Sequence, residues 1–139
     1  EDIEKAYTRA GIKAEVHEYF DNITTFYQKS HLVICRAGAS TVSELVSLAL
    51  PSILVPLPSA IDDHQTANAR HVTKVGAAWL LPEKDLISGN HCINYITVLR
   101  NHQGQYQMMC QAGQSIAKKQ AAGIMLDKCE DVLQGLEIM

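Results

Sequence analysis

The chain has 139 residues, of which 47% are hydrophobic, and this suffices for one compact domain with a buried core. Its formal net charge is -3 at pH 7 and its 12 lysines and arginines are scattered, which argues against a nucleic-acid-binding protein. Prolines interrupt the longest apolar stretch, which is too short to span a bilayer, and no signal peptide is recognised, so we expect a cytosolic protein. Attachment to a membrane surface stays open.

The four cysteines lie far apart in the sequence and form no Cys-x-x-Cys pair. Reduced thiols are therefore expected, rather than a disulfide framework or a zinc site. The six histidines form no metal-binding motif of the His-Glu-x-x-His type. We predict no metal site and no cofactor.

The N-terminal region is predicted to contain a helix, a strand and a second helix. Residues 2–10 have helical character and precede Gly11, a residue typical of helix C-termini. Residues 14–19 alternate between polar and apolar side chains, which predicts a strand. A second helix is then expected to run through Lys29.

Residues 32–50 combine a short strand, a turn and a helix. The apolar run at 32–35 is typical of a buried parallel strand, and the small residues at 37–40 predict a tight turn. Residues 41–50 carry apolar side chains at helical spacing. Because unpaired amides and the positive end of the helix dipole meet at such a helix start, this stretch can bind an anion.

Two interpretations of Glu44 follow from this stretch. Thr41 and Glu44 match the capping-box pattern, in which a hydroxyl and a carboxylate bind the free amides at a helix start. Alternatively, the Glu44 carboxylate binds a ligand. Strand–turn–helix elements with small residues are common in α/β domains and usually bind nothing, so both interpretations stay open.

Strand and helix patterns continue to alternate after this stretch. Residues 52–56 and 77–81 read as strands, 57–62 as a loop, and a helix is expected to begin at Asp62 or Asp63 and end near Val75. The alternation predicts an α/β fold, a Rossmann-like parallel sheet with helices on both faces.

Beyond Pro82 only helical patterns remain, at residues 87–100, 103–119 and 121–136. We expect this helical C-terminal tail to pack back on the sheet. The apolar face of its first helix is expected to consist of Ile93, Ile96, Val98 and Leu99.

Three segments are expected at the carboxyl edge of the sheet, where open parallel sheets bind ligands: residues 19–22, 36–41 and 57–65. Their polar side chains suit a phosphorylated ligand that is rich in hydroxyl groups. We favour a helix-capping role for Asp63 over ligand binding. The polar residues of this edge are Arg36, Ser40, Thr41, Glu44, Asp62, Asp63, His64 and Gln65.

The motifs at residues 35–44 and 62–69, with Pro51 and Val55-Pro56 between them, resemble the C-terminal domain of the MurG family, within glycosyltransferase family 28. That family comprises bacterial transferases that move GlcNAc from UDP-GlcNAc to lipid I and so form lipid II in peptidoglycan synthesis. The resemblance implies the C-terminal half of a GT-B fold, with residues 1–139 as the UDP-GlcNAc donor-binding domain. It also implies a cytoplasmic enzyme, peripheral on the inner face of the plasma membrane.

The resemblance implies roles for individual residues. The backbone of Phe20 would read the uracil edge, and residues 39–41 would form the phosphate-binding helix start. Glu44 would accept both ribose hydroxyls. Gln65, whose amide has a donor and an acceptor, would contact hydroxyls of GlcNAc with His64 beside it. The implied substrate-binding residues are Phe20, Ala39, Ser40, Thr41, Glu44, His64 and Gln65.

Relative to that family, the acceptor-binding N-terminal domain and the first strand of the donor domain are missing from residues 1–139. We therefore expect a donor half-site without a general base, inactive in transfer by itself, and assign no catalytic residue. Two alternatives are a separate donor-binding subunit that pairs with a membrane-anchored acceptor subunit, and a non-catalytic nucleotide-sugar-binding domain.

Overall fold

The fold is built on a three-stranded parallel sheet. The computed structural model describes residues 2–58 and 63–137, with side chains described through residue 120. The strands are β1 (Val33–Cys35), β2 (Ser52–Leu54) and β3 (Ala78–Leu80), in the order β1-β2-β3. Ile34 pairs with Ile53, which pairs with Trp79. The predicted parallel sheet is confirmed.

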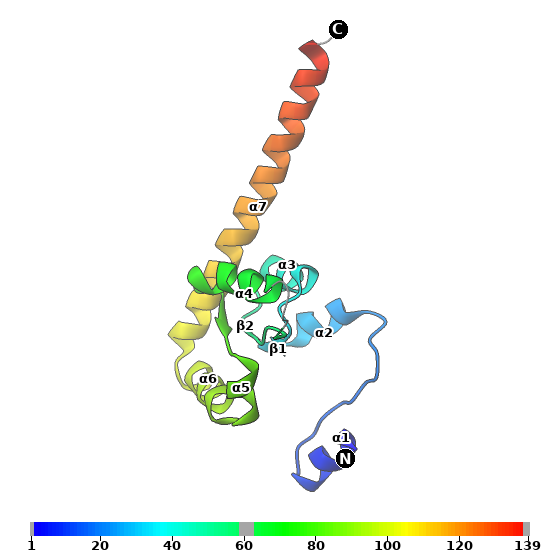
Figure 1. Cartoon of the computed structure of the whole chain (residues 1–139), viewed down its shortest axis with the longest axis vertical. Helices are drawn as coiled ribbons and strands as arrows, with labels where there is room; N and C mark the ends of the chain where they lie inside the picture. Colours follow the sequence, from blue (N-terminus) through cyan, green and yellow to red (C-terminus); the bar gives the residue numbers. More distant parts are fainter. Residues whose placement is uncertain (1, 59–62, 138–139) are drawn as a thin grey trace.

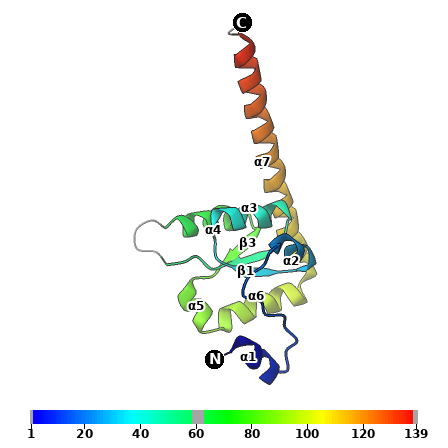
Figure 2. The same ribbon diagram turned by 90° about the vertical axis from the view of Figure 1, so that its right-hand side faces the viewer.

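Helices cover both faces of this sheet, as predicted for a Rossmann-like domain (Figures 1 and 2). One face packs against α3 (Ala39–Ser47), α4 (His64–Lys74) and the first part of α7 (Gln103–Glu137). The opposite face packs against α5 (Glu83–Ile87) and α6 (Asn90–Asn101). Because β2 lies in the centre, all three of its residues are buried, the polar Ser52 as well as Ile53 and Leu54.

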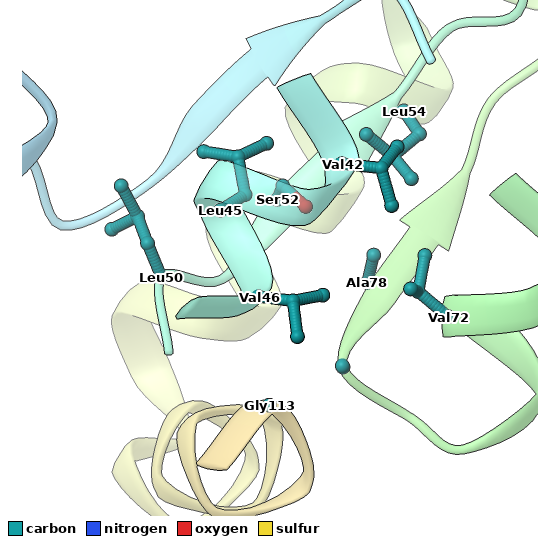
Figure 3. Close-up of a pocket in the computed structure, with 10 residues that line it drawn as sticks. Val42, Leu45, Val46, Leu50, Ser52, Leu54, Val72, Ala78 and Gly113 are labelled. Carbon is teal, nitrogen blue, oxygen red and sulfur yellow. The ribbon is translucent and has the colours of Figure 1, made fainter. Parts of the chain in front are cut away.

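The larger core cluster lies between the sheet, α3, α4 and α7 (Figure 3). An internal space of about 10 Å³ remains there, which is at most the size of one water molecule and far too small for a ligand. This space is therefore a packing defect of the core. The side chains drawn around it include Val42, Leu45, Val46, Leu50, Ser52, Leu54, Val72 and Ala78.

The N-terminal region contains α1 (Ile3–Arg9) and α2 (Ile23–Lys29), joined by an irregular segment. Gly11 follows α1 with a φ of 66°, as expected for a helix C-terminus. The strand predicted at residues 14–19 is wrong: the segment runs apart from the sheet as irregular backbone (Figure 1). A strand requires a hydrogen-bonded neighbour, and within the described residues none lies beside this segment.

The first predicted helix of the tail, at residues 87–100, is α6, and the short helix α5 before it was not predicted. Gly89, with a φ of 72°, separates α5 from α6. Most of the predicted apolar face of α6 is wrong, because Ile93, Ile96 and Val98 are exposed, whereas Leu99 is half-buried. Instead, the helix turns Cys92 and Tyr95 toward the sheet, and the Tyr95 ring lies 4.6 Å from that of Trp79. An aromatic pair of this kind buries more surface than the aliphatic residues would.

The second and third predicted helices of the tail form one continuous helix, α7. Its first part packs as predicted, with Met109 and Ile116 buried, whereas the rest extends away from the sheet (Figures 1 and 2). Gly113 allows the close approach of α7 to the end of α3, since a Cβ there would lie 3.2 Å from the Cα of Ala49. Within the described residues, no helix combines the length and the apolar character needed to cross a membrane.

Candidate functional site

The turn after β1 leads directly into the start of α3. Ala37 is fully buried, and Gly38 is the N-cap residue of the helix. The helix begins at Ala39, so Ser40 and Thr41 lie in its first turn, where backbone amides lack an acceptor within the helix. The helix start that the sequence predicted as an anion site is therefore present, although it begins two residues earlier than predicted.

This earlier start rules out the capping box. The N-cap position is occupied by Gly38, which has no side chain, and Thr41 already lies inside the helix. Glu44 lies one turn further along and cannot reach back to the N-cap amide as the capping-box pattern requires. The structural interpretation of Glu44 that the sequence left open is thus wrong.

Glu44 faces a shallow depression of about 420 Å³ between α2 and α3. Four of its six lining residues carry hydroxyl groups, and Glu44 supplies a carboxylate. Glu44 also lies close enough to Tyr27 of α2 to affect it. The pKa of Tyr27 is raised, first by burial and then by the charges of Cys35 and Glu44. The depression is lined by Thr24, Ser40, Ser43, Glu44, Ser47 and Leu48.

Phe20 lies in the irregular segment just before α2. Its ring is half-buried and packs at centroid distances of 5.0 Å from His17 and 4.5 Å from Phe26. The ring is engaged in this cluster, and the main chain of Phe20 is not part of it. That is the group for which the family resemblance implied a role.

Gln65, in the first turn of α4, connects the loops that follow β1 and β2. Its Oε1 accepts hydrogen bonds from the amide of Leu57 at 2.9 Å and from the amide of Ala37 at 3.3 Å. Asn68, one turn later, donates from Nδ2 to the carbonyl of Ala37 at 3.1 Å. The acceptor of Gln65 is therefore already occupied within the protein. His64 precedes Gln65 at the first position of α4 and is exposed.

Arg36, which the sequence placed among the polar residues of the sheet edge, is bound within the protein. Its Nη1 donates to the carbonyls of Val55 at 3.5 Å and Pro56 at 3.4 Å. Its Nη2 forms an ion pair with the carboxylate of Glu83 at the start of α5. Arg36 thus ties together the ends of the strands. We missed the roles of Asn68 and Glu83 from the sequence, although the spacing of Gln65 and Asn68 does place them on one helix face.

A second depression, of about 350 Å³, lies between α4, the start of α5 and the loop after β2. Asp63 lines it and occupies the N-cap position of α4, but its side chain makes no capping hydrogen bond, so the favoured capping role is not observed. Asp62 lies outside the described residues. The two depressions share no lining residue.

Comparison with known proteins identifies the family. The family model described as glycosyltransferase family 28 C-terminal domain matches residues 1–125, which include every residue of the candidate site. The chain belongs to this family.

Relatives and a solved structure agree with the family assignment. A protein of Azotobacter vinelandii named UDP-N-acetylglucosamine--N-acetylmuramyl-(pentapeptide) pyrophosphoryl-undecaprenol N-acetylglucosamine transferase is 40% identical over 129 residues, which are 93% of this chain and 36% of that protein. A protein of the same name from Thiobacillus denitrificans is 40% identical over 124 residues, 89% of this chain and 33% of that protein. The chain thus spans about a third of the length of these curated relatives.

The fold is shared with the crystal structure of Acinetobacter baumannii MurG. The TM-score is 0.70 at 33% sequence identity, over 80% of this chain and 34% of that chain. The predicted fold, the C-terminal half of a GT-B glycosyltransferase, is therefore confirmed.

Proposed function

We propose that this family 28 domain binds UDP-GlcNAc as the donor half of an inverting glycosyltransferase that converts lipid I into lipid II in peptidoglycan synthesis. The observation that carries the proposal is the place of Glu44. It lies one helical turn beyond an anion-binding helix start and faces a depression lined with hydroxyl groups. The names of the relatives support the choice of donor and acceptor.

The diphosphate of the donor is assigned to the first turn of α3, at residues 39–41. There the free amides and the helix dipole favour negative charge. Glu44 lies five residues beyond Ala39, about 7.5 Å along the helix axis at the standard rise per residue. That separation suits the distance between a diphosphate and the hydroxyls of its ribose, so the carboxylate can accept hydrogen bonds from both.

The two ends of the donor are assigned to the flanking segments. The uracil is assigned to the main chain at Phe20, next to α2, which also supplies Thr24 to the Glu44 depression. The GlcNAc group is assigned to the start of α4, at His64 and Gln65. The donor would thus cross the carboxyl edge of the sheet from α2 to α4, as expected for an open parallel sheet.

The proposal assigns no catalytic residue to residues 1–139. Attack by the acceptor hydroxyl on the anomeric carbon requires a base and an acceptor site. Both would be supplied by another domain. The lipid acceptor implies that the reaction takes place at the inner face of the plasma membrane. This chain by itself is therefore expected to bind the donor without transferring sugar.

Glu44→Gln tests the proposal by calorimetric titration with UDP-GlcNAc and with its 2′-deoxyribose analogue. Loss of a charge-assisted hydrogen bond costs about 1.5–3 kcal/mol, so UDP-GlcNAc should bind roughly 10- to 100-fold more weakly. The analogue, which lacks one of the two hydroxyls, should lose less. Glu4→Gln in the distant α1 is the matched control and should change neither affinity. Equal losses for both nucleotides would contradict the ribose assignment.

A further inference from the structure

The hydrogen bonds of Gln65 fix which end of its side-chain amide can meet a ligand. The amides of Leu57 and Ala37 both point at the same side-chain atom, at 2.9 and 3.3 Å. Both are N–H donors, so only the oxygen of Gln65 can occupy that position. A rotation that exchanged oxygen and nitrogen would set a donor against two donors. The orientation of the amide is thus determined by chemistry.

Asn68 completes the contact between α4 and the turn after β1. Ala37 is 0% exposed, so neither its N–H nor its C=O can bind water. Gln65 accepts from the N–H of Ala37, and Asn68 donates to its C=O at 3.1 Å. Both polar groups of this buried residue are therefore satisfied by side chains from α4. Leaving either one unpaired would carry a desolvation penalty.

These contacts control the position of the α3 start. The turn that Gln65 and Asn68 hold leads through Gly38 directly into the first turn of α3. The same Gln65 oxygen also holds Leu57, in the loop after β2. One atom of α4 therefore fixes the relative position of two loops at the carboxyl edge of the sheet.

We propose that Gln65 has two separate functions, positioning these two loops with its oxygen and offering a ligand only its amino group. This inference rests on the proposed function, in which the sugar of a nucleotide sugar lies at the start of α4. Asn68 acts as a positioning residue through Ala37. The expectation that Gln65 binds sugar hydroxyls through both a donor and an acceptor is revised accordingly.

A donor-only contact has a consequence for the choice of ligand. The ligand group opposite Gln65 must be an acceptor, such as a hydroxyl or carbonyl oxygen. A hydroxyl can meet this requirement and still donate its own proton to another group. An ammonium group at the same position has no lone pair and would be rejected.

Two substitutions of Gln65 separate the two functions. Gln65→Glu retains an oxygen that accepts from Ala37 and Leu57 and replaces the amino group by a second acceptor. Gln65→Ala removes both functions. Asn68→Ala weakens the positioning contact and leaves the amino group of Gln65 in place. The matched controls are Gln114→Glu on α7 and Asn94→Ala on α6, both exposed.

Amide hydrogen exchange, followed by NMR without any ligand, tests the positioning function. Protection of the Ala37 and Leu57 amides should persist in Gln65→Glu and fall at least about ten-fold in Gln65→Ala, because each amide then loses its acceptor. If Gln65→Glu loses protection as Gln65→Ala does, the bond assignment is overturned.

Titrations with UDP-GlcNAc and UDP test the donor function. Gln65→Glu should reduce the affinity for UDP-GlcNAc at least about ten-fold more than the affinity for UDP, which has no sugar. Asn68→Ala should weaken both ligands by similar factors, since it loosens the helix start without touching the sugar. A Gln65→Glu variant with an unchanged ratio of the two affinities would overturn the donor-only assignment.

The two titrations also separate this inference from the proposed function. If the unsubstituted chain binds neither UDP nor UDP-GlcNAc, the proposed function fails, and the donor function fails with it. The exchange measurements do not depend on a ligand and decide the positioning function in either case.

Discussion

Two regions of the molecule have apolar residues at regular spacing and differ in what those residues contact. The sheet region, residues 33–58 and 63–80, buries a core of apolar side chains, among them Leu45, Ile53 and Val72, between strands and helices. The N-terminal segment, residues 2–22, contains the amphipathic helix α1, yet none of the residues of α1 is buried, and Ile3 is 60% exposed. The spacing of apolar residues thus shows which side of a helix or strand can be buried. The element gains stability only where another element packs against that side.

The two regions should differ most in how much stability is lost when an isoleucine side chain is shortened to alanine. Ile53 in β2 is 0% exposed, so Ile53→Ala should lower the free energy of unfolding by about 3 kcal/mol through lost burial and a new cavity. Ile3→Ala in α1 removes the same atoms from a mostly exposed site and should cost less than about 0.5 kcal/mol. Urea unfolding of both variants measures the two values. Similar losses would show that α1 is packed in solution.

A smaller effect is expected where α7 meets α3, at the border of the sheet region. Gly113→Ala would place a Cβ 3.2 Å from the Cα of Ala49, which is main chain and cannot move aside easily. The expected loss is about 2 kcal/mol in the free energy of unfolding. Gly104→Ala, on the same helix in open space, is the control and should not destabilise. If the two variants have the same free energy of unfolding, α7 does not pack against the end of α3 in solution.

The smallest expected effect is a dependence on alkaline pH. Burial raises the pKa of the Cys35 thiol from 9.0 to about 11. Because the folded state holds this proton more tightly than the unfolded state, the contribution of Cys35 to stability is fully present below pH 9 and is lost as the pH rises through about 11. The unfolding free energy of Cys35→Ala, measured from pH 8 to 11, should fall less steeply than that of the unsubstituted chain. Parallel slopes would contradict the burial of this thiol.

The sequence predicted the elements of the sheet region well because their partners lie in the same region. The apolar run Ile53-Leu54-Val55 predicts a strand buried on both faces, and the helix before β3 ends next to Gly76, with a φ of 83°, close to the predicted end near Val75. The start of α3 was misplaced because Gly38 caps the helix without a side chain and so leaves no capping motif in the sequence.

The wrong predictions outside the sheet region arise because the partner of an element cannot be read from the spacing of its own residues. Cys92 and Tyr95 repeat at helical spacing just as Ile93 and Ile96 do, so spacing alone could not decide which side of α6 packs on the sheet. The side of α6 that packs is determined by Trp79 of β3, whose ring contacts Tyr95. The contacts at the candidate site are of the same kind, since Gln65 binds main-chain groups that lie 28 residues away in the sequence.

The short strand β1 at the end of the sheet also affects how the domain behaves at high concentration. Val33 donates toward β2 and Cys35 accepts from it, so the main-chain N–H and C=O of Ile34, between them, point to the outer side. The Ile34 side chain is 44% exposed, and within the described residues no strand covers this side. An uncovered strand edge with an apolar residue is a template for pairing between molecules. For residues 1–139 by themselves, pairing through β1 is therefore an expected route of self-association, and a charged residue at position 34 would oppose it.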